Sequence, residues 1–170
     1  MNGNISLSSH FKLREFTESA TARKHGIANE PPPEAVDNLC ALCIHTLEPL
    51  RKALGRPIII TSGYRCKALN AILTHSSDRS QHMAGQAADF YVGHTLMSKL
   101  LGVSRRELLI KAFRRIITDD TIAFDQLIIY PNFIHVSYVS FGGKNRRNII
   151  KANGRGTYCA LTREDALQLS

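Results

Sequence analysis

The sequence predicts an α+β fold, with helices packed on one face of a central antiparallel sheet. Helix and strand signals alternate along the chain without the regular rhythm that parallel α/β proteins show. The two clearest strands, 125–130 and 133–139, are separated only by Pro131 and Asn132, which indicates an antiparallel β-hairpin. These two observations favour an antiparallel sheet over a parallel one.

The N-terminal half predicts one long helix and one buried strand. Residues 7–27 combine an extended start with a short helix. Apolar residues then recur at helical spacing over 36–54, after a proline-rich start and up to a leucine-glycine stop, and Pro49 can kink this helix without ending it. Three isoleucines between Pro57 and Gly63 predict a buried strand that runs into a turn.

The C-terminal half contains a second helix and strand before the hairpin. A short helix is expected over 65–75, followed by a loop and by a strand at 87–92. The segment 104–117 carries apolar residues at helical period and predicts the second long helix. We expect the tail, 145–170, to be loosely structured or peripheral.

Length and composition are those of one ordinary folded domain. With 170 residues, of which 44% are hydrophobic and 21% charged, we expect a single domain over 1–170 with its core at about 5–150. No stretch has the roughly 18 consecutive apolar residues of a membrane span. The N-terminus lacks the basic and apolar regions of a secretory signal, so we expect synthesis in the cytoplasm.

The chain carries an excess of positive charge. Its 22 Lys and Arg against 14 Asp and Glu give a net charge of +8 at pH 7. Such an excess favours polyanions in general, including nucleic acid, anionic membranes and cell-wall polymers, and does not choose among them. Because the basic residues are scattered and no nucleic-acid reader motif is present, we expect a solvated basic surface and no nucleic-acid partner.

The four cysteines are Cys40, Cys43, Cys66 and Cys159. Cys40 and Cys43 share one face of the predicted long helix. A zinc ribbon would need a second matching pair, which this sequence lacks. We therefore expect buried free thiols rather than a cysteine metal site.

Three residues stand out as potential metal ligands. His82 and Asp89 lie near the two ends of the stretch SDRSQHMAGQAADF, and His135 lies in the last strand of the hairpin. Strand alternation places His135 and Ser137 on one face as a polar stripe in an apolar strand. Two histidines and one carboxylate are a ligand set of catalytic zinc sites, which leaves the fourth position to water. Spacing alone does not select this triple, because the chain has seven histidines.

The neighbouring residues are more specific. The segments TSGYRC, SQHMAGQAAD and FIHVSY resemble, in order and character, the signatures of the zinc D-Ala-D-Ala carboxypeptidases and dipeptidases and of the related L-Ala-D-Glu endopeptidases. Every fixed position of that family's Ser-x-His-x-x-Gly-x-Ala-x-Asp pattern is filled, by Ser80, His82, Gly85, Ala87 and Asp89. The resemblance covers roughly residues 5 to 150, and over this span the layout of the sequence is similar to a bacterial and phage-derived branch of the family. It implies a Hedgehog/DD-peptidase-like fold.

The resemblance implies one zinc ion held by three ligands, His82, Asp89 and His135. It implies further that Arg65 engages the substrate near the metal, where a planar guanidinium can polarise a carbonyl or bind a carboxylate with paired hydrogen bonds. Ser80 matches the serine beside the metal ligand, and Tyr64 is expected to line the pocket. The histidines outside the motif are expected to have no metal role: His10, His25, His45, His75 and His94.

One position departs from the family pattern. The better-known members place a glutamate or aspartate three residues before the last histidine, where it acts as general base and then as general acid. Asn132 occupies this position and cannot accept the proton.

The hairpin offers other candidates for the missing group. With a two-residue loop, Ile128 lies opposite His135, and Gln126 and Tyr130 share the face of His135 within reach of long side chains. Asp125 would then point to the opposite face, but a loop one residue longer would reverse this, so Tyr130 is only slightly favoured. Near neutral pH a phenol donates a hydrogen bond to an oxyanion more readily than it acts as a base.

Two functions remain. The leading hypothesis is a zinc peptidase that cuts an amide involving a D-amino acid in peptidoglycan stem peptides, of the D-Ala-D-Ala carboxypeptidase or L-Ala-D-Glu endopeptidase type. The alternative is a catalytically inactive, zinc-stabilised module of the same fold that binds peptidoglycan or has a structural role, which Asn132 favours. We expect a monomer, a peptidoglycan peptide as partner, and action at the cell wall after release from the cytoplasm.

Overall fold

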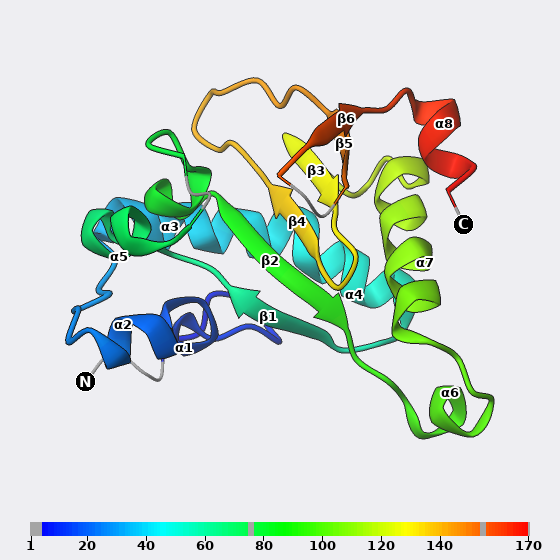
Figure 1. The fold of residues 1–170 in the computed structure, drawn as a ribbon, viewed down its shortest axis with the longest axis horizontal. Coiled ribbons are helices and arrows are strands. Elements are labelled where there is room, and N and C mark those ends of the chain that lie inside the picture. The colour runs from blue at the N-terminus through cyan, green and yellow to red at the C-terminus, as the bar shows by residue number, and fades with distance from the viewer. Residues whose placement is uncertain (1–4, 75–76, 154–155, 170) are drawn as a thin grey trace.

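A six-stranded sheet forms the middle of the described part of the chain, residues 5–74, 77–153 and 156–169 of a computed structural model (Figure 1). The strand order is β1-β2-β4-β3-β5-β6, and β3 with β5 is the one parallel pair among these strands. The strands are β1 Ile58–Ser62, β2 Ala87–Val92, β3 Gln126–Ile129, β4 Ile134–Ser137, β5 Asn148–Ala152 and β6 Tyr158–Ala160. The predicted α+β fold with a mostly antiparallel sheet is confirmed.

The helices are short, except for α7 and for one long helical rod whose middle is a π-helical turn. They are α1 Leu13–Thr17, α2 Ala20–Lys24, α3 Pro33–Leu42, α4 Glu48–Leu54, α5 Lys67–Ile72, α6 Leu96–Leu100, α7 Arg105–Thr118 and α8 Arg163–Leu167, with a π-helical turn η1 Cys43–Leu47 and a 3-10 turn η2 Gln81–Ala84. In Figure 1 the rod formed by α3, η1 and α4 runs behind the sheet, with α7 beside it. No helix within the described ranges is long and apolar enough to cross a membrane.

The long helix predicted over 36–54 exists, with a local irregularity. It begins at Pro33 and changes to π-helical geometry over Cys43–Leu47, just before Pro49. Because proline has no backbone N–H to donate, a wider turn ahead of it lets the helix continue without a break. Gly55, in the left-handed conformation, ends the rod.

The sheet buries one face against these helices and leaves the other for polar groups. In β2 and β4, Phe90, Ile134 and Val136 belong to the main hydrophobic core, while Asp89 and His135 alternate with them and point to the opposite face. Strand alternation thus separates the core from the functional face.

The hairpin has the predicted two-residue loop. The backbone N–H of Tyr130 donates to the carbonyl of Phe133 at 3.0 Å, and Ile128 lies opposite His135. On the other side of β4, Asp89 of β2 also lies opposite His135. The register therefore places Asp89 and Ile128 on either side of the histidine.

The expectation of a peripheral C-terminal tail is wrong. Strand β5 pairs in parallel with β3, β6 pairs with β5, and α8 packs on α7 (Figure 1). Ile149 and Ala166 lie in the hydrophobic core. The pairing of β5 with β3 joins segments distant in sequence, and such a contact leaves no local signal beyond one short alternating run.

Gly85 ends η2 and lies against the N-terminal part of the long helix. Its φ is +71°, in the left-handed region, and a Cβ there would overlap the backbone carbonyl of Ala35. The side-chain amide of Asn38 donates to the carbonyl of Ala84 at 2.9 Å, which fixes the same contact. Gly85 therefore has a steric role, because only a residue without a side chain allows η2 to approach α3 this closely.

We predict that Gly85→Ala destabilises the metal-free chain more than Gly55→Ala. Both glycines have φ values in the left-handed region, 71° and 59°, which costs other residues about 1–2 kcal/mol. A Cβ at Gly55 would meet nothing within 4 Å, whereas at Gly85 the backbone of Ala35 has to shift. Thermal unfolding of both variants in chelator measures the difference, and equal losses would contradict the packing argument.

Candidate metal centre

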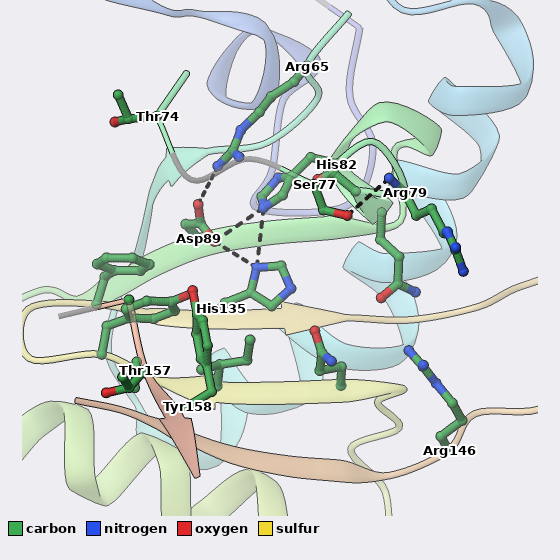
Figure 2. Close-up of a pocket in the computed structure, with 18 residues that line it drawn as sticks. Arg65, Thr74, Ser77, Arg79, His82, Asp89, His135, Arg146, Thr157 and Tyr158 are labelled. Atoms are coloured by element: carbon green, nitrogen blue, oxygen red, sulfur yellow. Dashed lines mark hydrogen bonds and ion pairs between the residues drawn. The ribbon is translucent and has the colours of Figure 1, made fainter. Parts of the chain in front are cut away.

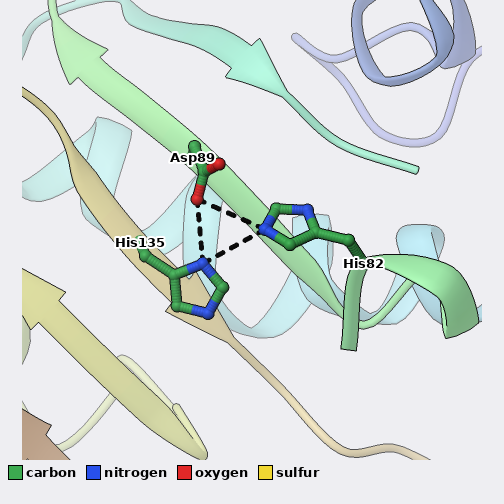
Figure 3. A group of neighbouring side chains, drawn as sticks. All are labelled: His82, Asp89 and His135. Carbon is green, nitrogen blue, oxygen red and sulfur yellow. Dashed lines mark hydrogen bonds and ion pairs between the residues drawn. The ribbon is translucent and has the colours of Figure 1, made fainter. Parts of the chain in front are cut away.

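Three polar side chains from three separate elements converge on one point. His82 comes from η2, Asp89 from β2 and His135 from β4 (Figure 3). Each offers one ligand atom, and these atoms all lie within 4.8 Å of one another. Asp89 Oδ1 lies 2.8 Å from His135 Nδ1 and 3.3 Å from His82 Nε2, and the two nitrogens are 3.2 Å apart. Two imidazole nitrogens and one carboxylate oxygen suit a zinc ion with an open fourth position.

The His82 ring is oriented by its other nitrogen. Nδ1 lies 2.7 Å from the carbonyl of Gly63, which can only accept, so Nδ1 carries the proton and Nε2 faces the cluster with its lone pair. Burial lowers the pKa of His82 and so favours the neutral ring that a metal requires. A backbone carbonyl that holds the distal ring nitrogen is the usual support of a metal-binding histidine.

Asp89 is held as a carboxylate. Burial by itself would raise its pKa, but the adjacent His82 and His135 outweigh burial and keep the pKa of Asp89 far below its ordinary value. Arg65 Nη2 donates to Oδ2 at 2.7 Å, which leaves Oδ1 directed at the two histidines. The hydroxyl of Thr61 donates to the backbone carbonyl of Asp89 at 3.1 Å.

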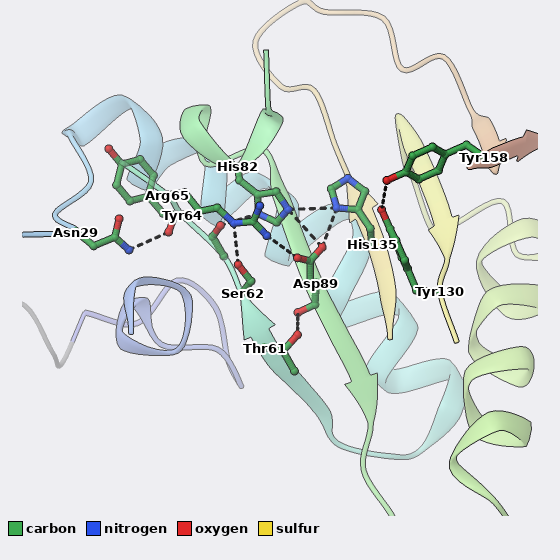
Figure 4. Close-up of polar contacts among 11 residues, drawn as sticks. Asn29, Thr61, Ser62, Tyr64, Arg65, His82, Asp89, Tyr130, His135 and Tyr158 are labelled. Atoms are coloured by element: carbon green, nitrogen blue, oxygen red, sulfur yellow. Dashed lines mark hydrogen bonds and ion pairs between the residues drawn. The ribbon is translucent and has the colours of Figure 1, made fainter. Parts of the chain in front are cut away.

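Arg65 is fixed in place by the turn that follows β1 (Figure 4). Its Nε donates to the hydroxyl of Ser62 at 3.0 Å, and its backbone N–H donates to the carbonyl of His82 at 3.2 Å. Asn29 braces this turn, because its amide donates to the carbonyl of Tyr64 at 2.9 Å and accepts from the N–H of Cys66 at 2.8 Å. Sequence reasoning missed Asn29 and Ser62, whose roles depend on contacts made only in the folded chain.

The metal-ligand cluster lies in a cleft of about 880 Å³. Among the described residues its lining comprises Arg65, Thr74, Ser77, Arg79, Ser80, Gln81, His82, Asp89, Gln126, Ile128, Tyr130, Phe133, His135, Arg146, Ala152, Gly156, Thr157 and Tyr158. Figure 2 shows Arg79 and Arg146 at one end of the cleft and Thr157 and Tyr158 at the other. The cleft therefore has a basic end and an aromatic end, with the ligands between them.

Most residues expected in the site line this cleft, but one does not. Arg65, Ser80 and Tyr130 lie in the lining with the three ligands. Tyr64, expected to line the pocket, is only 7% exposed and belongs to the hydrophobic core. Its ring points away from the ligand cluster (Figure 4), because Tyr64 and Arg65 are consecutive and leave the chain on different sides. The placement expected for Tyr64 is therefore corrected.

Tyr130 meets a tyrosine that sequence reasoning missed. Its hydroxyl lies 3.2 Å from the hydroxyl of Tyr158 in β6, and its ring stacks on Phe133 with centroids 4.2 Å apart. Burial, followed by the hydrogen bond with Tyr158, raises the pKa of Tyr130 above its ordinary value. The phenol of Tyr130 therefore stays protonated near neutral pH. Tyr158 escaped notice because its strand was expected to be loose tail.

Neither the family's base position, Asn132, nor the alternative Asp125 places a carboxylate base in the cleft. Asn132 is exposed in the hairpin loop and is absent from the cleft lining. Asp125 is buried, does not line the cleft, and accepts hydrogen bonds from Gln81 and Arg146. Among the described lining residues, the only carboxylate is the ligand Asp89.

The remaining histidines and cysteines lie outside the cluster. His10 pairs with Glu48 at 2.8 Å, His45 stacks on Tyr138, and His25 is exposed, while His75 lies outside the described residues. Within the described ranges, no other group of three potential ligands is found. All four cysteines are free. Cys43 is buried, Cys40 and Cys66 are half-buried, and Cys159 is exposed. The expectation of buried thiols is therefore confirmed for Cys43 and wrong for Cys159.

The fold and the site together define a candidate metal-dependent hydrolase, with an open cleft above two histidines and one carboxylate. The family described as peptidase M15 matches residues 9–137, a span that includes all three ligands. The chain therefore belongs to this family of zinc D-Ala-D-Ala carboxypeptidase-like proteins. No curated protein matches the chain. Membership of a zinc-dependent family indicates zinc peptidase activity on peptidoglycan-type substrates, and the His82, Asp89 and His135 cluster can hold one metal ion.

We predict that the native chain binds about one zinc ion through this cluster. His82→Ala and His135→Ala each remove a ligand and are expected to lose the metal, as measured by elemental analysis of the purified protein. His25→Ala is the matched control, because this histidine is exposed and lies outside the cluster. A native chain that is free of metal, or a His82→Ala variant that keeps it, would contradict the assignment.

Proposed function

We propose that the chain hydrolyses amide bonds that involve D-amino acids in peptidoglycan stem peptides, as a zinc peptidase of the D-Ala-D-Ala carboxypeptidase or L-Ala-D-Glu endopeptidase type. The observation that carries this proposal is the convergence of His82, Asp89 and His135 in an open cleft within the span matched by the peptidase M15 family. Zinc bound there supplies a Lewis acid and lowers the pKa of a coordinated water toward about 7.

Arg65 has two roles in this proposal. One edge of its guanidinium is used by Ser62 and Asp89, which keeps the carboxylate oriented toward the two histidines. The side chain is also part of the cleft lining, so the rest of its planar group can donate to a substrate carbonyl or carboxylate. Ser80, in the same lining and two residues before His82, is proposed to contact the substrate beside the metal.

Tyr130 is proposed as the donor to the oxyanion that develops at the scissile carbonyl. Its raised pKa keeps the phenol protonated, and Phe133 stacks on its ring. In this proposal Tyr158 is the donor in the hydrogen bond between the two hydroxyls, which leaves the proton of Tyr130 for the oxyanion. A donor held in advance, in a partly buried site, stabilises developing negative charge without a reorganisation cost.

The described cleft lining has no carboxylate other than Asp89 that could transfer a proton. A positioned general base typically contributes about 10²- to 10⁴-fold in rate, and the described lining offers no carboxylate for that role beyond the ligand Asp89. We therefore propose that solvent carries the proton and that turnover is lower than in relatives with an acidic residue at the position of Asn132.

The second candidate function is a zinc-stabilised module that binds peptidoglycan without cutting it. The absence of a base among the described lining residues favours it. It retains the same metal site and the same cleft, so it differs from the first candidate only in turnover.

Digestion of purified peptidoglycan separates the two functions. We predict that zinc-loaded protein releases peptide fragments detectable by mass spectrometry, that chelator abolishes the release, and that the masses identify the bond cut. His135→Ala should release nothing, and His25→Ala should act as the native chain. If a chain shown to hold zinc leaves peptidoglycan of several wall chemistries undigested, this result would favour the binding module.

We predict that Tyr130→Phe lowers kcat/KM by about 10²- to 10³-fold on a peptide that contains the bond identified by the digestion. This is the usual loss when one oxyanion donor is removed. Because the phenol stays protonated, the variant should keep the shape of the native pH profile. Tyr138→Phe is the matched control, since this half-buried tyrosine stacks on His45 and lies outside the cleft lining. Native activity in Tyr130→Phe, or loss of one limb of its pH profile, would exclude the donor role.

A further inference from the structure

A fully buried carboxylate lies beside the cleft and uses all its contacts to hold cleft residues. Asp125 is 1% exposed. Its Oδ1 accepts from Nε and from the backbone N–H of Arg146, each at 2.9 Å, and its Oδ2 accepts from Nη2 of Arg146 and from Nε2 of Gln81 at 3.0 Å. Arg146 and Gln81 both line the cleft. Asp125 thus acts on the cleft through its neighbours.

The hydrogen bonds leave one side of the guanidinium available. Nε and Nη2 of Arg146 face Asp125, and Nη1 has no hydrogen-bond partner among the described residues. The Arg146 side chain is 59% exposed although its partner is buried. Arg146 is therefore a charged, planar donor that is exposed to solvent and held in place by the buried Asp125.

The energetics do not explain this pair as a stabilising feature. Burying a carboxylate costs several kcal/mol, and a buried ion pair often contributes no more than well-packed apolar residues would. Burial would raise the pKa of Asp125, but the hydrogen bonds from Arg146 and Gln81 lower it, so the charge persists. What the arrangement does provide is a fixed position for Arg146, and preorganised donors bind ligands with less loss of entropy.

The charge of the cleft matches an anionic ligand. Its described lining contains three arginines, Arg65, Arg79 and Arg146, against one carboxylate, Asp89. Arg79 and Arg146 lie on the same side of the ligand cluster in Figure 2, and Gln81 precedes the ligand His82 directly. This basic end lies along the cleft from the metal ligands, where a substrate that spans the site would extend.

We propose that Arg146, anchored by Asp125 and assisted by Arg79, forms a carboxylate-binding subsite for the peptide substrate. The inference rests on the proposed function and adds to it a requirement for a free carboxylate near the scissile bond. Two carboxylates of a stem peptide fit this chemistry, the terminal carboxylate and the free carboxylate of an internal D-glutamate. Arg146 lies beyond residue 137, where the family match ends, whereas Asp125 and Arg79 lie within the matched span.

Synthetic stem peptides with one carboxylate amidated at a time test the subsite in the zinc-loaded chain. The native chain should prefer the acid over the amide at one of the two positions, which identifies the carboxylate. Arg146→Gln should raise KM for that acid about 10- to 100-fold, the range for a lost charged hydrogen bond, with kcat and the constants for the amide unchanged. Arg146→Lys keeps the charge without the fork and should give an intermediate KM.

Controls separate binding from folding. Arg147→Gln is the matched control, because this adjacent arginine stacks on Phe124 and lies outside the cleft lining. Zinc content and thermal unfolding of each variant show that it is folded. An equal rise in KM for acid and amide, or no rise in Arg146→Gln, would overturn the subsite.

The subsite can fail independently of the peptidase. If the native chain cuts none of these peptides, calorimetry with the same acid and amide pairs measures affinity instead. A preference for the acid that Arg146→Gln removes would support the subsite in a binding module. Equal affinity of the native chain for acid and amide would overturn the subsite whether or not the peptide is cut.

Discussion

The pairing of β2 with β4 is the constraint on which the site depends. It places Asp89 opposite His135, so two candidate metal ligands from distant parts of the sequence meet as a cross-strand pair. The same strands bury Phe90 and Ile134 on their other face, which determines the register, because a slip of one residue would move these side chains into water and His135 into the core. The free energy of core packing thus maintains the geometry of the candidate metal centre.

The third ligand needs a different kind of support, because His82 lies on a short 3-10 turn outside the sheet. Packing of Gly85 against Ala35 brings that turn close to the long helix, and the carbonyl of Gly63 sets the ring orientation. That carbonyl belongs to the turn after β1, and the register of β1 against β2 shifts just before this turn, between Ile60 and Ser62. The irregularity places Ser62 opposite Asp89, from where it holds Arg65 on the carboxylate. Each ligand is therefore oriented by a part of the fold other than its own element.

The parts of the site that sequence reasoning could find are those encoded locally. His82 and Asp89 belong to one motif, and the hairpin around His135 follows from a two-residue loop between alternating strands. Tyr158 and Arg146 could not be found in this way, because Tyr158 lies in β6 and Arg146 lies two residues before β5. The pairing of β5 with β3 joins distant segments, and β6 is an exposed strand that pairs with β5. Asp125 is a candidate base on sequence alone, because a hairpin loop one residue longer would turn it to the face of His135. The structure instead buries its carboxylate against Arg146.

The described lining lacks a carboxylate base and contains several arginines, and these two features are linked by the positive charge of the cleft. A carboxylate placed near Arg65, Arg79 or Arg146 would form an ion pair, and its pKa would fall too low for effective proton abstraction near neutral pH. The positive potential that these arginines create instead favours the deprotonated form of any acid held in the cleft, including water, and would favour the oxyanion that Tyr130 is proposed to face. In the proposed mechanism, hydrogen-bond donors and cations therefore contribute part of the stabilisation that an acidic residue provides in a less basic cleft.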